Sequence, residues 1–510
     1  MTRPSLLMAL ALAPFAAVAG AVHEGVVELP KAPRTQGFGL CAWAPNGDAV
    51  LVCQHGDYVE RQDGRQGYLL SAYFVVDAAT GKATPLCRAH ECLWTPDGRI
   101  LARGYAPRST KDVEALTFNP GQHGDRAVAT LLERDGHVIG ELATRAIECM
   151  PSPTGKRFLM TQEVAGRNNY TCLKRLVVEA LGGKATTILP PIAERPGRLV
   201  GFRHGVRWLT PDRFRVAVVD MDAKEAAGAP PGMWLNVTPD WFDYDLAKGA
   251  WEKLAGEALD DARAERYPLA DGEVLVKPGR VDTLVGGKRA TLLWPEAKAM
   301  RIVVRAASAD GARLLVCVEV PQIGKGGEGF GGEGAAPQPA ALEPGYYALD
   351  LAKGARTRIE VKPEAIWNFN YSVCNYLEDG ALLIIPDDAP AATLDEATGR
   401  LAPLKVPGFP WEKFIITKWA TPARNSYGRG QAMGGGRVAV LARQGRFVKT
   451  PHAIVVFRGK AAAGCLAVPQ GFSLGERSSL HWSPDGSALL VTSNDGTKLW
   501  LTRTVPGGHL

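Results

Sequence analysis

The sequence predicts an all-β fold, a single β-propeller built from four-stranded antiparallel blades. A turn motif of the Pro-Asp-Gly type recurs along the chain, and a second Gly turn follows several of its copies. The composition agrees, because 57 Gly and 36 Pro among 510 residues favour short strands and turns over long helices. A repeat that runs through a whole chain is typical of propellers and related architectures.

The first repeated motif is a short apolar stretch, a tight turn and an alternating apolar strand. Gly supplies the positive φ that such a turn needs, and the Asp or Asn before it bonds the local backbone. The motif therefore indicates a β-hairpin. Six clear copies have their turn glycine at Gly47, Gly98, Gly155, Gly311, Gly380 and Gly486. Weaker copies lie at residues 208–219 and 434–441.

The second motif is a strand that ends in Asp and is followed by a Gly turn and another strand. It occurs at residues 75–82, 244–249, 349–354 and 394–400. Together the two motifs give four strands per repeat, which we call A, B, C and D, and this is the content of a propeller blade. We expect eight blades. Seven is the alternative if residues 415–468 are irregular, and a ninth is added if residues 266–295 form a degenerate blade.

The first 20 residues have the pattern of a secretory signal peptide. Arg3 precedes an apolar run from Leu6 to Ala19, and small residues follow in the spacing of a cleavage site. The run is interrupted by Pro14 and is short for a bilayer core of about 30 Å. We therefore predict a signal peptide at 1–20, a propeller domain at 21–510 and a periplasmic or secreted protein without a membrane span.

The net charge of +6 is too weak to indicate a nucleic-acid partner. Export would also separate the protein from nucleic acids, ATP and cytosolic cofactors. We expect no cofactor, and the sequence leaves the oligomeric state open.

The last repeat contains three strands, and the sequence offers a replacement for the fourth. Residues 25–29 read GVVEL and precede the first copy of the repeat. We expect this segment to supply the missing outer strand, because a shared blade covers an edge that would otherwise invite aggregation.

The final repeat resembles the WD-like propeller repeats of TolB-type periplasmic proteins. The resemblance is carried by WSPDG at residues 482–486 and LLVTSNDG at 489–496, and as a repeat it extends over most of residues 38–505. The separate N-terminal domain of TolB-type proteins has no counterpart here. The repeats are also similar to those of the prolyl-oligopeptidase propeller, without its hydrolase domain. The resemblance implies a fold and leaves activity open.

Cysteines recur at fixed places in the repeat. Four of the nine lie six residues before a turn glycine, and two lie six residues after one. Since an oxidising compartment permits disulfides, the candidate pairs are Cys41–Cys53, Cys87–Cys92, Cys149–Cys172 and Cys317–Cys374, with Cys465 left over. The alternative is that cysteine serves only as a small apolar residue on a crowded strand.

No catalytic motif has its required context. The GFSLG at residues 471–475 matches GxSxG, but too little chain follows it to supply the other members of a triad. We interpret it as a turn between blades. The Gly-rich segment 324–334 has no phosphate-loop lysine and reads as an insertion. The nine histidines form no HxH or HxxxH pair, so we assign neither catalytic nor metal-binding residues.

The connections between strands B and C are the longest loops, at residues 105–125, 221–240 and 321–344. In a propeller these loops share one face with the mouth of the central channel, and long loops are often functional. Polar residues gather where the B strands end. The candidate binding residues are Gln54, His55, Asp57, Glu163, Asp220, Asp222, Glu319, Asp387, Asp388, Asn494 and Asp495.

Two functions are consistent with this pattern. The first is a binding or scaffold module that presents the loop-rich face to a protein or glycan partner. The second is an enzyme, a lyase or hydrolase acting on a carbohydrate, with its site in the channel mouth. Convergent acids and a histidine would favour the enzyme. Because strong catalytic motifs are lacking, we favour the binding module.

Overall fold

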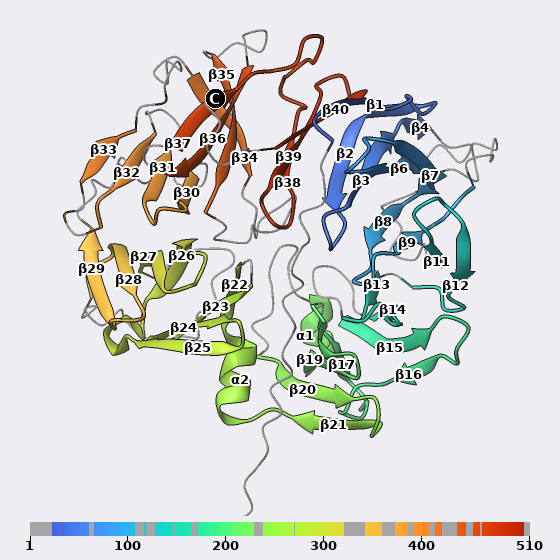
Figure 1. Ribbon diagram of the computed structural model, residues 1–510. Helices are drawn as coiled ribbons and strands as arrows, with labels where there is room; N and C mark the ends of the chain where they lie inside the picture. Colours follow the sequence, from blue (N-terminus) through green and yellow to red (C-terminus); the bar gives the residue numbers. More distant parts are fainter. Residues whose placement is uncertain are drawn as a thin grey trace, which may run out of the picture.

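The fold is all-β. The computed structural model describes residues 23–503 except for 61–65, 108–116, 119–127, 147, 166–171, 204, 229–237, 270, 321–341, 360–372, 386–390, 397, 399, 405, 407–413, 421–435, 445–451 and 460–461. The expected signal peptide and the Gly-rich segment 324–334 lie outside these residues. In Figure 1 the sheets follow one another in chain order around a common centre.

Seven sheets of the described residues contain four antiparallel strands each. The first two are formed by β2 (Thr35–Trp43), β3 (Ala49–Gly56), β6 (Ser71–Asp77) and β7 (Ala83–Ala89), and by β8 (Glu91–Trp94), β9 (Ile100–Arg103), β11 (Ala129–Leu132) and β12 (Val138–Glu141). The next two are β22 (Glu265–Leu269), β23 (Gly272–Lys277), β24 (Arg280–Val285) and β25 (Lys288–Leu293), and β26 (Arg301–Ala307), β27 (Arg313–Glu319), β28 (Gly345–Asp350) and β29 (Ala355–Ile359). The expected degenerate blade at 266–295 is therefore a regular four-stranded sheet.

The other three four-stranded sheets come from the end of the chain. They are β30 (Val373–Tyr376), β31 (Leu382–Ile385), β32 (Ala392–Leu394) and β33 (Leu401–Pro403); β34 (Phe414–Ala420), β35 (Val438–Gln444), β36 (His452–Gly459) and β37 (Ala462–Leu466); and β38 (Leu480–Trp482), β39 (Ala488–Thr492), β40 (Lys498–Arg503) and β1 (Gly25–Glu28).

One longer sheet has nine strands and contains two four-stranded groups joined through β17 (Arg198–Phe202). The first group is β13 (Glu148–Pro151), β14 (Arg157–Ala165), β15 (Cys172–Ala180) and β16 (Thr186–Ile188). The second is β18 (Arg207–Thr210), β19 (Arg213–Asp222), β20 (Asp240–Asp245) and β21 (Ala250–Lys253). A small sheet contains β4 (Tyr58–Glu60), β5 (Gln66–Leu69) and β10 (Thr117–Phe118), and the helices are α1 (Ala223–Gly228), α2 (Gly256–Arg263) and the 3₁₀ turn η1 (Pro295–Ala297).

The repeated turns have the backbone that the sequence predicts. All six turn glycines have positive φ, between 67° and 83°. At the last of them, Asp485 accepts hydrogen bonds from the Ser483 hydroxyl at 2.6 Å and the Ser487 amide at 3.0 Å. A side chain at Gly155 would also collide with the carboxylate of Asp97, since a Cβ there would lie 2.5 Å from its oxygen.

Tryptophan side chains connect consecutive sheets. The indole of Trp94 on β8 donates to the carbonyl of Ala42 on β2 at 2.9 Å, and Trp482 on β38 donates to Ala420 on β34 at 3.1 Å. The same bond from Trp43 on β2 reaches His481 on β38 at 3.2 Å. These bonds join first strands of neighbouring sheets, including the sheets from the two ends of the chain.

Arginines make a second connection from the turns. Arg99 follows the turn glycine Gly98 and donates to the carbonyl of Gly155, the next turn glycine, at 3.1 Å. Arg313 reaches Gly380 in the same way at 2.9 Å. Each of these hairpins is therefore tied to the turn of the sheet that follows it.

The N-terminal segment forms the expected outer strand. β1 pairs antiparallel with β40, with Gly25 opposite Leu501 and Glu28 opposite Lys498. Val27 and Leu29 are buried in a cluster that includes side chains from the β2–β7 sheet. The prediction that residues 25–29 complete the last sheet is confirmed for β1.

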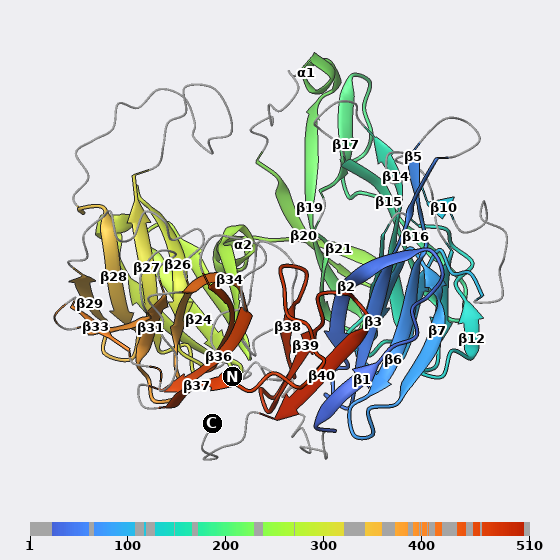
Figure 2. The same cartoon turned by 90° about the horizontal axis from the view of Figure 1, so that it is seen from above.

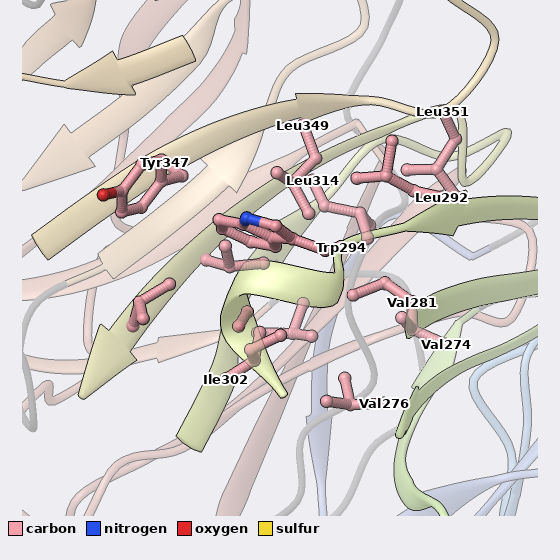
Figure 3. Close-up of a cluster of buried hydrophobic side chains, with 14 of the residues drawn as sticks. Val274, Val276, Val281, Leu292, Trp294, Ile302, Leu314, Tyr347, Leu349 and Leu351 are labelled. Atoms are coloured by element: carbon pink, nitrogen blue, oxygen red, sulfur yellow. The ribbon is translucent and has the colours of Figure 1, made fainter. Parts of the chain in front are cut away.

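The largest buried side chains lie between sheets. Trp294 is 2% exposed and packs edge-on against Tyr347, with ring centroids 5.1 Å apart. Figure 3 shows the indole of Trp294 between Tyr347 on one side and Val274 and Val281, from β23 and β24, on the other. This cluster joins the β22–β25 and β26–β29 sheets.

Deletion of residues 21–31 is expected to cause a large loss of stability, because β40 loses its outer partner β1 and the apolar cluster around Val27 opens to water. Thermal denaturation of this variant, compared with a chain that lacks only residues 1–20, measures the effect. Equal melting temperatures for the two proteins would show that β1 is dispensable.

Replacement of Trp294 by Ala is expected to lower the free energy of unfolding by about 3–5 kcal/mol, the cost of a large cavity in a packed core. The neighbouring Leu293→Ala is the control, because Leu293 is 64% exposed and should cost less than about 0.5 kcal/mol. Urea denaturation distinguishes them, and similar losses would contradict the assigned packing.

Candidate functional site

The B strands end on the side of the sheets opposite the Pro-Asp-Gly turns, which we call the mouth side. Strands β4 and β5 follow β3 there, β10 follows β9 and pairs with β5, and α1 follows β19. Figure 2 shows β5, β17 and α1 projecting on one side of the molecule. Strand β10 and α1 lie within the long loops that the sequence predicts at residues 105–125 and 221–240, whereas β4 and β5 lie outside them.

Asp220 and Asp222 lie at the end of β19, and both are engaged. Arg198 and Arg195 donate to the Asp220 carboxylate at 2.8 and 2.5 Å. Burial opposes ionisation of Asp220, but these arginines lower its pKa. Asp222 accepts the amides of Lys224 and Glu225 at 2.8 and 3.1 Å, so it caps α1, and those bonds lower its pKa.

Glu319 ends β27 and faces two arginines. Arg301 lies directly opposite it on β26, and the charged groups of Arg301 and Arg305 are each 3.6 Å from its carboxylate. A similar cross-strand pair joins Glu91 on β8 to Arg103 on β9 at 2.7 Å. The mouth side therefore carries arginine–carboxylate pairs where the sequence suggested free acids.

The candidate residues at and just after the end of β3 are Gln54, His55 and Asp57, and two of them hold neighbouring backbone in place. Gln54 is 1% exposed, and its carbonyl oxygen accepts the amide of Ala32 at 2.9 Å, which fixes the segment before β2. The backbone amide of Asp57 donates to Arg34 at 2.9 Å. Desolvation lowers the pKa of His55, which favours the neutral imidazole at pH 7.

The last candidate pair belongs to a turn. Asn494 accepts the backbone amide of Arg477 at 3.1 Å, and Asp495 accepts the hydroxyl of Ser493 at 2.5 Å and the amide of Thr497 at 3.1 Å. These bonds fix the connection between β39 and β40.

For the remaining candidates, Glu163, Asp387 and Asp388, the structure describes at most the backbone. Glu163 is paired with Arg175 through the backbone of β14 and β15. Asp387 and Asp388 lie outside the described residues. Among the candidate acids whose side chains the structure describes, the printed partners of Asp220 and Glu319 are arginines, which the sequence analysis missed. Cross-strand register was the signal that would have found Arg301 and Arg103.

The most buried charges on the mouth side lie between β23, β24 and α2. Asp282 is fully buried and accepts from Arg280 and Thr291 at 2.7 Å, with the ammonium of Lys277 at 3.0 Å. Lys277 also contacts Asp261 on α2. This network binds α2 to the sheet. Burial opposes ionisation of Asp282, but its three donors lower the pKa.

The proposed disulfide pairs are separate thiols in this structure, as far as the described cysteines show. Cys149 lies at the level of Val177 on β15, because both pair with Met160. Cys172 is five residues further along β15, a separation of about 17 Å. The Cys149–Cys172 pairing is therefore wrong, since bonded cysteines have Cα atoms within about 7 Å.

The register bears on one other pairing, because Cys41 is opposite Val52 and not Cys53 in the backbone of β2 and β3. Cys317 on β27 and Cys374 on β30 lie on neighbouring sheets, so the Cys317–Cys374 pairing stays a prediction. For Cys87–Cys92 the sulfur atoms are 3.8 Å apart.

The GFSLG segment is a turn between β37 and β38, as expected. The amide of Phe472 donates to Pro469 at 3.1 Å, and no helix follows it in the described residues. Across the described part of the chain, no group of three or more His, Cys, Asp or Glu side chains has the arrangement of a metal site. No described helix is long and apolar enough to cross a membrane.

Comparisons with known proteins give no family. No family model matches the chain, and no curated protein matches it. Solved structures with similar folds include a prolyl endopeptidase, with 13% identity, a TM-score of 0.33 and coverage of 71% of this chain and 47% of that one. The chain therefore spans about half the length of that structure.

Two further structures are similar over most of this chain. A Porphyromonas gingivalis dipeptidyl peptidase 4 has 11% identity and a TM-score of 0.38, with coverage of 92% of this chain and 58% of that one. A eukaryotic initiation factor has 8% identity and a TM-score of 0.40, with coverage of 93% and 91%. At these values the similarities assign no function.

The Asp282→Asn variant is expected to lose about 3 kcal/mol of stability at pH 7, because Lys277 and Arg280 lose their fully buried counter-charge and keep only the more exposed Asp261 and Glu257. The folded-state pKa of Asp282 is lowered, so its contribution is present above the unfolded value of about 3.9 and is lost as pH falls through the folded one. The difference from wild type should therefore shrink at pH 3.

Urea denaturation at both pH values measures this difference. Asp212→Asn is the control, because Asp212 is 57% exposed in its pair with Arg157, and exposed pairs contribute less than about 1 kcal/mol. A pH-independent loss in the Asp282 variant would contradict the ionic role.

Proposed function

We propose that this chain is an exported β-propeller that binds an acidic partner, a protein or glycan, through its mouth side. Counting the two groups of the nine-stranded sheet separately gives nine four-stranded units in the described residues. This is one more than the eight expected from the repeats, because β22–β25 supplies the ninth unit, which the sequence left open. The pairing of β1 with β40, with the bond from Trp43 to His481, supports closure of the ring by the N-terminal strand.

The observation that carries the binding proposal is that two mouth-side arginines are each held by a carboxylate and are still largely exposed. Arg195 and Arg301 are held by Asp220 and Glu319, yet their side chains are 60% and 59% exposed. A guanidinium has five N–H donors, so each arginine keeps donors for a second acceptor while one carboxylate fixes its position. Positioned arginines of this kind are enriched where proteins bind partners.

The projecting elements support a recognition surface rather than a small reaction centre. Strand β17 and α1 extend beyond the sheets on the side that carries Arg195 (Figure 2). No observation specifically favours the carbohydrate lyase or hydrolase. The proposal of export rests on the leader-like sequence of residues 1–20, and the resemblance to TolB-type proteins contributes only the repeat.

The test measures binding of the mature chain to two defined probe sets, an array of uronate-containing oligosaccharides and an array of acidic peptides. Reversal of both arginines, Arg195→Glu with Arg301→Glu, is expected to weaken binding at least tenfold, about 1.4 kcal/mol. The matched control is Lys248→Glu with Lys353→Glu, since these lysines are 77% and 79% exposed on the turns between strands C and D.

The control variant should bind within twofold of wild type, and binding should fall with added salt. Equal losses in both variants, or no binding to either array, would contradict the proposal. Cleavage of an oligosaccharide during incubation would instead favour the enzyme.

A further inference from the structure

Three thiols gather between the first two sheets. Cys53, Tyr73 and Cys87 lie side by side across β3, β6 and β7, because Tyr73 pairs with Cys53 on one side and with Cys87 on the other. Cys92 on β8 packs in the same buried cluster. Cys87 and Cys92 are 1% and 3% exposed.

Geometry brings one pair of these sulfur atoms into contact and excludes the Cys53–Cys87 pair. The sulfur atoms of Cys87 and Cys92 are 3.8 Å apart, a contact that side-chain rotation can close to a bond of about 2.05 Å. Cys53 and Cys87 are separated by the intervening strand β6, and two strand spacings amount to about 9.6 Å. This exceeds the Cα separation of about 7 Å that a disulfide spans.

We propose that Cys87 and Cys92 form a disulfide when the chain folds in an oxidising compartment. The two thiols lose two protons and two electrons and form one S–S bond, and a disulfide oxidant is reduced to two thiols. Glutathione disulfide or an exchange protein of the envelope has the required chemistry. The bond would join β7, the outer strand of one sheet, to β8, the first strand of the next.

The folded environment indicates when this bond forms. Burial, with the neighbouring Cys87, raises the pKa of the Cys92 thiol. Because exchange needs a thiolate, the closed native protein should oxidise slowly, and the bond should form before the cluster is buried. We therefore expect the disulfide to form during folding, before the two thiols are buried.

The disulfide would also fix part of the mouth side. The end of β7 exchanges backbone hydrogen bonds with Ala106, from the Arg88 amide at 3.1 Å and back to the Arg88 carbonyl at 2.8 Å. The connection that follows leads directly into Glu91, the partner of Arg103. A disulfide from Cys87 on β7 to Cys92 on β8 would tie together the two ends of the connection between these strands, and would therefore limit its opening.

The experiment compares the full chain produced with a bacterial export signal and the same chain produced in a reducing cytosol. Each protein is denatured, alkylated without reductant, digested with trypsin and analysed by mass spectrometry. Trypsin cleaves after Arg88, so the bond appears as peptides 83–88 and 89–99 linked together, 2 Da lighter than their sum. We expect this species in the exported protein, and its loss after dithiothreitol.

Two variants and two internal controls define the outcome. Cys53→Ser should leave the linked peptides unchanged, whereas Cys92→Ser should leave Cys87 alkylated. Cys149 and Cys172 should be alkylated in every sample. Full alkylation of Cys87 and Cys92 in the exported protein, or a link from either of them to Cys53, would overturn the proposal.

Discussion

The architecture depends on bonds between consecutive hairpins. A four-stranded sheet exposes two apolar faces, and it is stable only when neighbouring sheets cover them. Apolar packing alone leaves sheets free to slide, because it is non-directional. The indole bonds from Trp43, Trp94 and Trp482 and the arginine bonds from Arg99 and Arg313 are directional. These hydrogen bonds fix one hairpin against the next. Because the tight Gly turns make each hairpin rigid, fixing the hairpins also fixes the position of the sheets.

Much of this fold could be predicted because its determinants are local. Positive φ at Gly47 or Gly486 follows from a turn that only a few residues can form, and residues 25–29 were found because the last repeat lacked a strand. The β22–β25 sheet was less evident because only two residues join β22 to β23, whereas five residues join the first two strands at each of the six clear copies. The fusion of two groups through β17 was not foreseen, since a strand that bridges two groups leaves no periodic signal.

The candidate site was predicted less well, and the reason is physical. Position along a strand shows that Glu319 or Asp220 lies at its mouth-side end, but not which side chain faces it. Arg301 lies opposite Glu319 through register, whereas Arg195 reaches Asp220 from a loop that no repeat describes. The same limit applies to the cysteines. The sequence suggested a Cys149–Cys172 pair, yet Cys149 on β13 lies at the level of Val177 on β15, five residues away from Cys172.

The pairing of β1 with β40 also orders events during synthesis. The first described strand leaves the ribosome before any other, but its partner is nearly the last to emerge. Until then Val27 has no strand beside it, and the edge of β40 cannot yet protect it. The intermediate sheets are free to form one after another, since their hairpins are local, whereas completion of the last sheet waits for the whole chain. An interrupted nascent chain would therefore carry an open sheet edge, and its survival would depend on factors that shield such edges.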